Sequence, residues 1–306
     1  VMRSFSSYSF SNWLKLQPIK YLIKYTRNRI VSNLYVAKKS QNTEHFLNEC
    51  KDLKDKNILL VIAFEQPWVI EWLLKMSKKY VTDAVVLVFD NSRDKSKKGE
   101  IKKVCHTQNT LYLQLPENNT THVNRSHSLA MQWIFENIVQ AIQPKSFAYI
   151  DHDLIPVKKT SIAERLGNQD FYGWLKTGLV RRNPDSWSLW AGYCIYDYDS
   201  VRNKKLYFMY DFPQGLDTGG GNYEVLYRNY NKDKMQFSNI SIAEVQVPNI
   251  GLVRDIMLID DNWYHIGSVG YNDNFVSKKD YCLSLSKLID SGIEWDELVV
   301  SQRTAQ

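Results

Sequence analysis

The chain has 306 residues, 44% of them hydrophobic, with 39 Lys and Arg against 33 Asp and Glu for a net charge of +6. This is the composition of a globular protein with one large or two small domains, and it excludes disordered, collagen-like and disulfide-scaffold chains. Residues 1–43 hold eight basic residues and no acidic one, so residues 44–306 carry 31 basic and 33 acidic residues. Because this larger part lacks the basic excess that neutralises phosphates, we expect no nucleic-acid partner.

The four cysteines lie far apart in the sequence, at Cys50, Cys105, Cys194 and Cys282. Their spacing fits neither a zinc site nor a disulfide framework, so we expect buried, reduced thiols. No run approaches the roughly 18 apolar residues of a membrane span, and no segment resembles a signal peptide. The sequence therefore predicts a cytoplasmic protein.

Residues 18–35 have the pattern of an amphipathic helix. The apolar face holds Ile19, Leu22, Ile23 and Ile30, and a second face holds Lys20, Lys24 and Arg27. Such a helix can lie on an anionic membrane surface, so residues 13–39 are a candidate for peripheral membrane contact. The alternative is a helix packed on the protein with its cations in solvent. Residues 1–56 are the predicted basic helical extension, in which residues 38–56 form a linker or an exposed helix.

From residue 57 onward, apolar runs alternate with amphipathic segments. The runs predict strands, and the segments predict helices. The predicted strands are residues 58–63, 84–89, 110–115 and 147–150, and the predicted helices are residues 69–80, 95–105 and 130–142. Strands separated by helical crossovers predict an α/β fold with a doubly wound, mostly parallel sheet and helices on both faces.

After Asp153 the elements become shorter and rich in aromatic residues. They are residues 171–175, 187–196, a glycine cluster at 219–221, a helix-like segment at 223–230 and a last amphipathic helix near 283–289. No Gly, Pro or Ser-rich linker separates the two halves. We therefore expect a single domain at 57–306, with a nucleotide-binding half at 57–153 and an acceptor half at 154–306 wrapped around the same sheet.

Two aspartates with one residue between them follow the fourth predicted strand, in Asp151-His152-Asp153. In open parallel sheets, ligands bind outside the carboxyl ends of the strands. Two carboxylates at that edge can share a divalent cation and leave coordination positions for phosphate oxygens and water. Paired aspartates are also common in turns, so the position of this pair, after an apolar strand halfway along the alternation, is what favours a metal site.

Together with Phe89-Asp90-Asn91-Ser92, this triplet resembles the D-x-D and D-D/N-G/A-S signatures of GT-A glycosyltransferases, especially the large family-2-like group. The resemblance covers roughly residues 57–272 and rests on the order and spacing of short motifs. It implies an α/β sheet that binds a nucleotide sugar, and a glycosyl transfer that depends on a divalent cation, Mn²⁺ or Mg²⁺.

The resemblance implies donor contacts after the first two strands. Asp90 matches the acidic residue that contacts the base or ribose of the nucleotide. Ala63, Phe64 and Glu65 match the loop that wraps around the base.

A third donor element resembles the N-x-G motif at the start of the helix that leads to D-x-D. It is Asn124-Arg125-Ser126, in which a serine replaces the glycine. The segment from Asn124 to Asp151 is about one helical turn longer than usual, which keeps the helix in phase. The resemblance makes Arg125 a further candidate for donor binding.

The resemblance also implies the metal ligands. Asp153 would ligate the cation directly, while Asp151 would reach the ribose or a metal-bound water. His265, in residues 263–268, matches a histidine ligand near the end of the catalytic domain, although a lone histidine can equally be structural. On the period-2 backbone of a strand, His152 should point away from the metal.

Residues 215–221 resemble the region where inverting members place a catalytic aspartate near the acceptor. Asp217 is the candidate base, although Leu216 stands where the family usually has a second acidic residue. The alternative is that Asp217 is the N-cap of the following helix and that the glycines form a tight turn.

Aromatic residues make up 13% of the chain and crowd the stretch after the triplet, at Trp174, Trp187, Trp190 and Tyr193. Aromatic faces stack on sugar rings, but most aromatics are core residues. Only Trp190, which precedes Ala191 and Gly192, is a candidate for the sugar site.

These observations predict a metal-dependent hexosyltransferase that moves a sugar from a nucleoside-diphosphate donor to a hydroxyl of a glycan or lipid-linked acceptor, with inversion. Two alternatives remain open. One is a metal-dependent phosphoester hydrolase, which normally needs more His and Asp ligands. The other is a non-catalytic carbohydrate-binding protein of the same fold.

Overall fold

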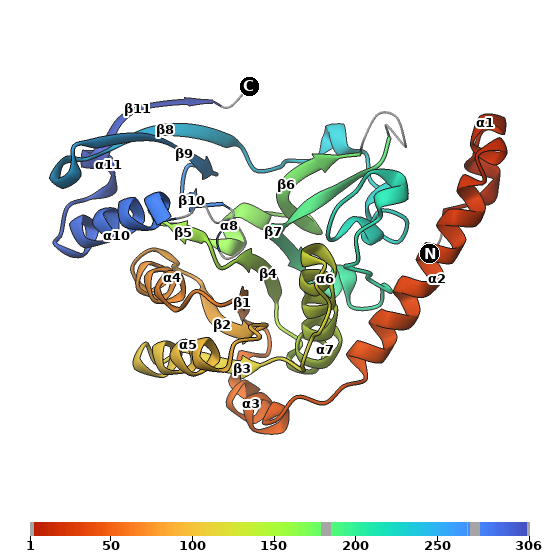
Figure 1. Ribbon diagram of the computed structural model, residues 1–306, viewed down its shortest axis with the longest axis horizontal. Coiled ribbons are helices and arrows are strands. Elements are labelled where there is room, and N and C mark those ends of the chain that lie inside the picture. The colour runs from red at the N-terminus through yellow and green to blue at the C-terminus, as the bar shows by residue number, and fades with distance from the viewer. Residues whose placement is uncertain (1–2, 179–184, 268, 270–275, 305–306) are drawn as a thin grey trace.

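The computed structural model describes residues 3–178, 185–267, 269 and 276–304 (Figure 1). The helices are α1 Phe10–Leu14, α2 Gln17–Val36, α3 Thr43–Glu49, α4 Pro67–Tyr80, α5 Lys95–Thr107, α6 Val123–Ile134, α7 Gln140–Ile142, α8 Ile162–Leu166, α9 Tyr198–Val201, α10 Val276–Asp290 and α11 Trp295–Leu298. The strands are β1 Asn57–Ala63, β2 Ala84–Asp90, β3 Leu111–Gln114, β4 Ser146–Asp151, β5 Leu154–Pro156, β6 Phe171–Thr177, β7 Trp187–Asp197, β8 Ile240–Val247, β9 Leu252–Ile259, β10 Trp263–His265 and β11 Val299–Thr304.

Within these residues, six strands form the central sheet in the order β3-β2-β1-β4-β7-β6. Strands β1 to β4 run parallel, and β7 lies antiparallel between β4 and β6. The chain returns to the sheet through α4, α5 and α6, as a parallel sheet requires. The carboxyl ends of β1, β2 and β4 therefore share one edge, where the predicted motifs lie.

The side chains of β1 explain why both faces of this sheet are covered. Successive residues of a strand point to opposite faces. Leu60 packs in a core cluster with residues of α3 and α6, whereas its neighbour Val61 packs in a cluster with residues of α4 and α5. All β1 residues after Asn57 are buried. This arrangement confirms the predicted α/β fold with a mostly parallel sheet and helices on both faces (Figure 1).

A second, antiparallel sheet has the order β11-β8-β9-β10-β5 among the described strands. This sheet was not predicted from the sequence, because the second half of the chain was expected to wrap around the first sheet. The signal was present in β8, where buried and partly exposed residues alternate along Ile240–Val247. Helix α10 covers this sheet, since Tyr281 and Leu285 pack in the same cluster as Ala243 and Val245.

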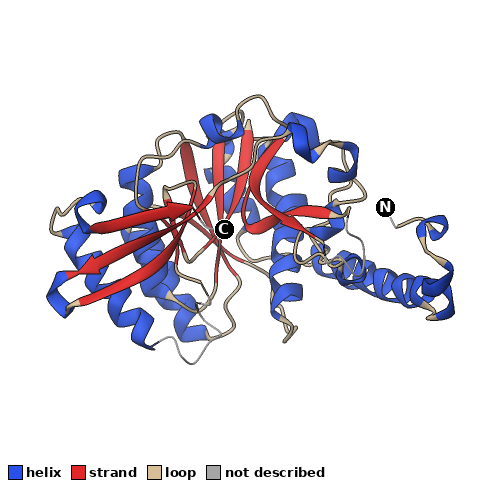
Figure 2. Cartoon of the chain, turned by 90° about the horizontal axis from the view of Figure 1, so that it is seen from above, coloured by secondary structure: helices blue, strands red, loops and turns tan. Residues whose placement is uncertain are grey.

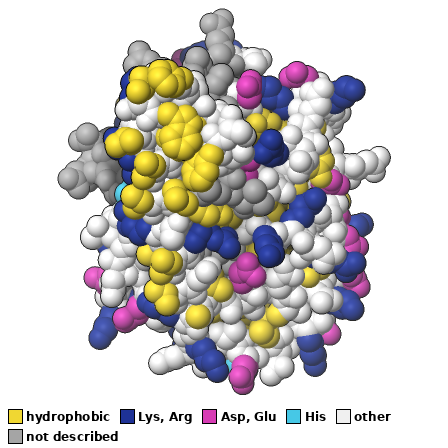
Figure 3. All heavy atoms as spheres, turned by 90° about the vertical axis from the view of Figure 1, so that its right-hand side faces the viewer, with side chains coloured by type: hydrophobic (Ala, Val, Ile, Leu, Met, Phe, Trp, Pro, Cys, Tyr) yellow, Lys and Arg dark blue, Asp and Glu magenta, His cyan; other side chains and the backbone are white. Residues whose placement is uncertain are grey.

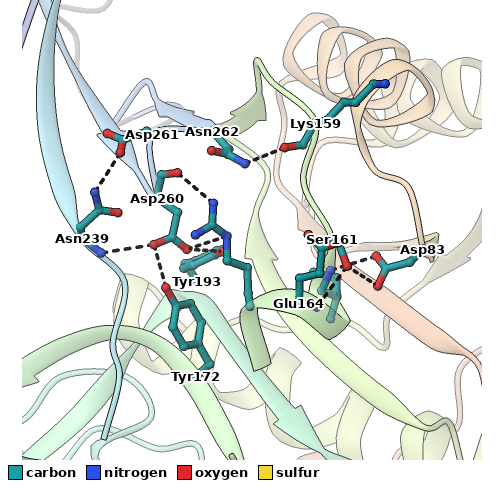
Figure 4. Close-up of polar contacts among 12 residues, drawn as sticks. Asp83, Lys159, Ser161, Glu164, Tyr172, Tyr193, Asn239, Asp260, Asp261 and Asn262 are labelled. Carbon is teal, nitrogen blue, oxygen red and sulfur yellow. Dashed lines mark hydrogen bonds and ion pairs between the residues drawn. The ribbon is translucent and has the colours of Figure 1, made fainter. Parts of the chain in front are cut away.

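One buried carboxylate, Asp260 at the end of β9, joins the two sheets (Figure 4). Its oxygens accept hydrogen bonds from the hydroxyls of Tyr172 on β6 and Tyr193 on β7, both at 2.8 Å, and from the backbone N–H of Asn239 at 3.2 Å. Arg165 of α8 lies 3.7 Å from the carboxylate and donates to the Asp260 carbonyl. These contacts fix the second sheet against the first.

The N-terminal helices and the second sheet lie at opposite ends of the molecule (Figure 2). Helix α2 stands at the edge of the protein, and the segment after it contains α3 and a short 3-10 helix, Lys51–Leu53, in place of an extended linker. Phe46 of α3 is buried in the main core. Over the described residues, no helix has the length and apolarity needed to cross a membrane.

Two further expectations can be compared with the structure. All four cysteines are free and buried, as predicted. The segment 223–230 is not a regular helix, however, because it forms turns followed by the 3-10 helix Tyr227–Asn229. The fully buried ring of Tyr227 stacks on Trp187 at 5.0 Å, so aromatic packing holds this segment.

Candidate functional site

A cleft of about 540 Å³ opens at the carboxyl edge of the central sheet. Its wall combines loops after β1, β2 and β4 with the start of α6, the middle of β7, the loop at residues 217–218 and the end of β10. The predicted site residues among its lining are Phe64, Glu65, Asp151, Asp153, Trp190, Asp217 and His265. The fold thus gathers seven side chains that are spread over 200 residues of sequence.

Asp151 is the last residue of β4 and lies beside Gly192 of the neighbouring strand β7. A Cβ atom on Gly192 would stand 2.4 Å from Oδ2 of Asp151 and 2.4 Å from the indole of Trp190. A side chain at this position would therefore displace the carboxylate or the indole. Trp190 contacts the rings of Trp174, at a centroid distance of 5.2 Å, and His265, at 4.8 Å.

Asp153 and His265 lie close together because Asp153 directly precedes β5 and His265 is the last residue of β10. These two strands pair in the second sheet. Leu154 of β5 pairs with His265 of β10, and the N–H of Ile266 donates to the carbonyl of Asp153 at 3.0 Å. Oδ1 of Asp153 and Nε2 of His265 lie 4.0 Å apart. The structure thus brings together the two residues predicted as metal ligands.

The carboxylates of Asp151 and Asp153 lie close together in the cleft, and the neighbouring His127 does not neutralise them. Desolvation and the nearby Asp153 carboxylate raise the pKa of Asp151 to about 7. Burial lowers the pKa of His127 to about 4, so this ring is neutral at pH 7, although it lies 3.6 Å from Asp151. The neutral His127 offsets none of the negative charge of Asp151 and Asp153, so the part of the cleft around these two carboxylates favours a cation.

The donor set fits a divalent cation held jointly by the protein and a ligand. Asp153 offers a hard oxygen and His265 an imidazole nitrogen, a combination that suits Mn²⁺. The described residues contain no group of three or more His, Cys, Asp or Glu side chains placed to hold a metal by themselves.

Asp217 lies in an exposed loop on the wall of the cleft. Its Oδ1 accepts hydrogen bonds from the side-chain amide of Asn124 and from the N–H of Thr218. It does not cap a helix, because the following 3-10 helix Gly220–Asn222 has Gly219 as its N-cap with no side-chain cap bond. The alternative interpretation of Asp217 as an N-cap is therefore wrong.

The glycine cluster serves packing inside this loop. Gly219 has a φ of +85°, which favours glycine. A Cβ atom on Gly221 would stand 2.6 Å from the carbonyl oxygen of Tyr207, and one on Gly220 would stand 2.4 Å from Cβ of Leu216. The protein itself therefore fills the space beside these two glycines.

Glu65 ties two loops of the cleft together. Its N–H donates to Oγ of Ser92 at 2.7 Å, and its Oε1 accepts from the N–H groups of Arg93 and Asp94. Glu65 also has a φ of +53°, an unusual backbone conformation for this residue type. These contacts position Phe64 and Arg93 in the cleft lining.

Three predicted donor-binding residues do not line the cleft. Ala63 is fully buried at the end of β1. Asp90 is 1% exposed, and its two oxygens accept hydrogen bonds from the N–H of Ser92 and the hydroxyl of Tyr112. Arg125 donates to the hydroxyl of Tyr210 at 2.9 Å and lines a separate cavity of about 270 Å³ between α2 and the body of the protein. Neighbouring residues of a helix point about 100° apart, which explains why Asn124 reaches the cleft and Arg125 does not.

Two residues of this site, His127 and Arg93, were not predicted from the sequence. His127 stands one helical turn after Asn124, a spacing that places both on one face of α6. Arg93 directly follows the Phe89–Ser92 motif and brings a positive charge to the cleft. His152 was expected to point away, yet it lines the cleft, with Nδ1 3.1 Å from the carbonyl of Ile62. The strand ends at Asp151, so its alternation does not extend to His152.

Ser268 and residues 270–275, where the family resemblance ends, lie outside the described residues. No protein-family model matches the chain, and no curated protein matches it.

Among solved structures, the chain is similar to the mannosyltransferase PcManGT from Pyrobaculum calidifontis, solved in complex with GDP-Man and Mn²⁺. The identity is 10% and the TM-score 0.34, over 58% of this chain and 55% of that one. It is also similar to TarS from S. aureus, with 16% identity and a TM-score of 0.34 over 50% of this chain and 30% of that one. The matched region spans about half of the mannosyltransferase and under a third of TarS, and likeness at this level carries no functional conclusion.

Proposed function

We propose that this protein is a metal-dependent glycosyltransferase that moves a sugar from a nucleoside-diphosphate donor to a hydroxyl of a glycan or lipid-linked acceptor, with inversion. The observation that supports this function is the convergence of Asp151, Asp153, Trp190, Asp217 and His265 on one cleft at the carboxyl edge of the parallel sheet. Open α/β sheets bind nucleotides at this edge.

In this proposal, Asp153 and His265 would hold the divalent cation. When bound, the cation offsets the negative charge that builds on the diphosphate as it departs. Arg93 adds a positive charge to the same cleft. Phe64 and Glu65 lie on the loop that would contact the nucleoside, and the face of Trp190 packs against the sugar ring.

Asp217 acts as the general base. It accepts the proton of the acceptor hydroxyl while the hydroxyl oxygen bonds to the anomeric carbon of the sugar. The bond from that carbon to the diphosphate oxygen breaks, and its electron pair leaves with the nucleoside diphosphate. The hydrogen bond from Asn124 orients the Asp217 carboxylate for this step.

Thermal unfolding with Mn²⁺ and a panel of nucleoside-diphosphate sugars tests the donor site. A ligand that binds only the folded state raises Tm as its concentration exceeds Kd. We expect one sugar nucleotide to raise the Tm of the wild type in the presence of Mn²⁺. Asp153→Asn, which keeps the shape and loses the charge, should abolish this metal-dependent rise. Asp199→Asn, an exposed carboxylate on α9, is the matched control and should behave like wild type.

The same samples separate the alternatives. A transferase slowly hydrolyses one nucleotide sugar, a phosphoester hydrolase cleaves simple phosphate esters, and a carbohydrate-binding protein does neither. An unchanged metal-dependent rise in Asp153→Asn would show that Asp153 does not hold the cation. Cleavage of simple phosphate esters, lost in the same variant, would replace the transferase by the hydrolase.

A further inference from the structure

Helix α2 packs on the protein through its polar and aromatic side, not through its aliphatic side. Its buried residues include Tyr21, Asn28, Ser32 and Tyr35. Tyr21 donates to Oδ2 of Asp211 at 3.3 Å, and Tyr35 donates to the carbonyl of Pro116 at 2.8 Å. These contacts fix the rotation of the helix, so the direction in which its other side chains point is determined.

The aliphatic side of α2 faces solvent. With 3.6 residues per turn, Ile19, Ile23, Ile30 and Leu34 lie opposite the packed tyrosines. Ile23 is 63% exposed and Leu34 66%, and exposed apolar residues continue through α1, where Phe10 is 78% exposed. Figure 3 shows hydrophobic side chains gathered in a band on this face of the molecule. Single exposed apolar residues are normal, whereas a contiguous band marks an interaction surface.

Cations flank this band. Lys20, Lys24 and Arg27 lie along one border of the aliphatic side, and Lys15 precedes the helix. Lys and Arg side chains lie beside the hydrophobic band in Figure 3. The first acidic residue of the chain is Glu44, after α2 has ended. The segment that carries the apolar band, residues 3–43, therefore contributes only positive charge to this face.

We propose that α1 and the outer face of α2 bind an anionic lipid surface, with α2 lying parallel to the membrane plane. The aliphatic and aromatic side chains enter the boundary between headgroups and acyl chains, while the flanking cations contact anionic headgroups. Four cations within α2 make an orientation across the bilayer costly. This site is separate from the cleft and does not depend on the proposed transferase activity.

Charge complementarity selects the lipid surface over a second copy of the chain. Two copies that paired through this band would bring two all-positive helices together, and like charges across an interface oppose binding. An anionic bilayer satisfies the apolar band and the cations at once. Self-association is therefore the alternative outcome of the experiment.

The test is co-sedimentation of the full chain with lipid vesicles at about 0.1 M salt. One set of vesicles contains phosphatidylcholine alone, and the other also contains phosphatidylglycerol, at about 30% of the lipid. We expect binding to the anionic vesicles and weak binding to the neutral ones. The variant Ile23→Ser/Ile30→Ser/Leu34→Ser should lose at least about tenfold in partitioning. Leu252→Ser/Val253→Ser/Val300→Ser, which removes three exposed apolar residues from the second sheet, is the matched control and should bind like wild type.

A charge variant separates the two parts of the proposal. Lys20→Gln/Lys24→Gln/Arg27→Gln should lose on the order of a hundredfold in partitioning to anionic vesicles and should lose most of its salt dependence. Equal wild-type binding to neutral and anionic vesicles would overturn the role of the cations. A wild-type dimer that dissociates in the Ile23/Ile30/Leu34 variant and does not bind vesicles would overturn the lipid surface in favour of a second copy.

Discussion

The cleft and the contact between the two sheets both contain enclosed carboxylates, but these carboxylates differ in their hydrogen-bond and ion-pair partners. Every side-chain oxygen of Asp260 accepts a hydrogen bond from a tyrosine, and Arg165 stands beside it. In the cleft, Asp151 has Asp153 and the neutral His127 as neighbours, and its pKa is raised to about 7. Paired carboxylates stabilise a fold, whereas carboxylates that face a cavity and repel each other are typical of functional sites.

The largest effect of a substitution should be a loss of turnover in a variant of the cleft residue Asp217. Asp217→Asn keeps the size of the side chain but cannot accept a proton from an acceptor hydroxyl. We expect turnover to fall by a factor on the order of 10²–10⁴ while donor affinity and Tm stay close to wild type. Initial rates of sugar transfer at saturating donor, with donor titrations by fluorescence or calorimetry, measure both quantities.

Asp199→Asn again serves as the control for that experiment and should retain full turnover. If Asp217→Asn keeps most of its activity, then Asp217 only orders its loop through Asn124 and Thr218. A retaining mechanism, which needs no such base, would then be favoured.

The next largest effect should come from the contact between the sheets. Asp260→Ala leaves the buried hydroxyls of Tyr172 and Tyr193 without their acceptor and Arg165 without its ion-pair partner. We expect the free energy of unfolding to fall by about 3–5 kcal/mol. Urea denaturation monitored by tryptophan fluorescence gives this value.

Asp153→Asn is the comparison variant in the cleft, and it should change the free energy of unfolding by less than about 1 kcal/mol. In the proposed function, the charge of Asp153 serves metal binding and is not needed for folding. If Asp153→Asn destabilises the protein as much as Asp260→Ala does, the distinction between the two regions is wrong.

The smallest effect concerns Asp211, which combines features of both regions. Its Oδ2 accepts hydrogen bonds from Tyr21 and Gln214, while its Oδ1 has no partner among the described residues. Burial raises its pKa to about 6. The folded state therefore favours the neutral carboxyl, so its stabilising contribution is complete below about pH 4 and is lost as the pH rises through about 6.

Asp211→Asn should remove this dependence. Between pH 4 and pH 7, the wild type should lose about 1–3 kcal/mol of unfolding free energy relative to the variant. Urea denaturation at several pH values measures the difference, and Asp199→Asn should follow the wild-type curve. Parallel curves for wild type and Asp211→Asn would show that Asp211 titrates at its ordinary pKa.

Much of the central sheet could be predicted from the sequence because its signals are local. Residues 58–63 and 84–89 are continuous apolar runs, and a strand buried on both faces needs such a run. The carboxyl edge of a parallel sheet then follows from the connections, which place Asp151 beside the loops after the first two strands. In the second sheet, β5 and β10 are three residues long, too short for a periodic pattern, while the alternation along β8 was present in the sequence but not recognised.

The sequence by itself determined which residue types stand at the ends of the strands and that α2 has an aliphatic and a basic side. Only the tertiary structure decided which of them meet. His265 reaches Asp153 through the pairing of β5 with β10, and Asp90 turns inward because Tyr112 and Ser92 satisfy its oxygens. The aliphatic side of α2 points outward because its tyrosines find partners on the protein. These outcomes depend on contacts between residues far apart in the chain, which no local pattern encodes.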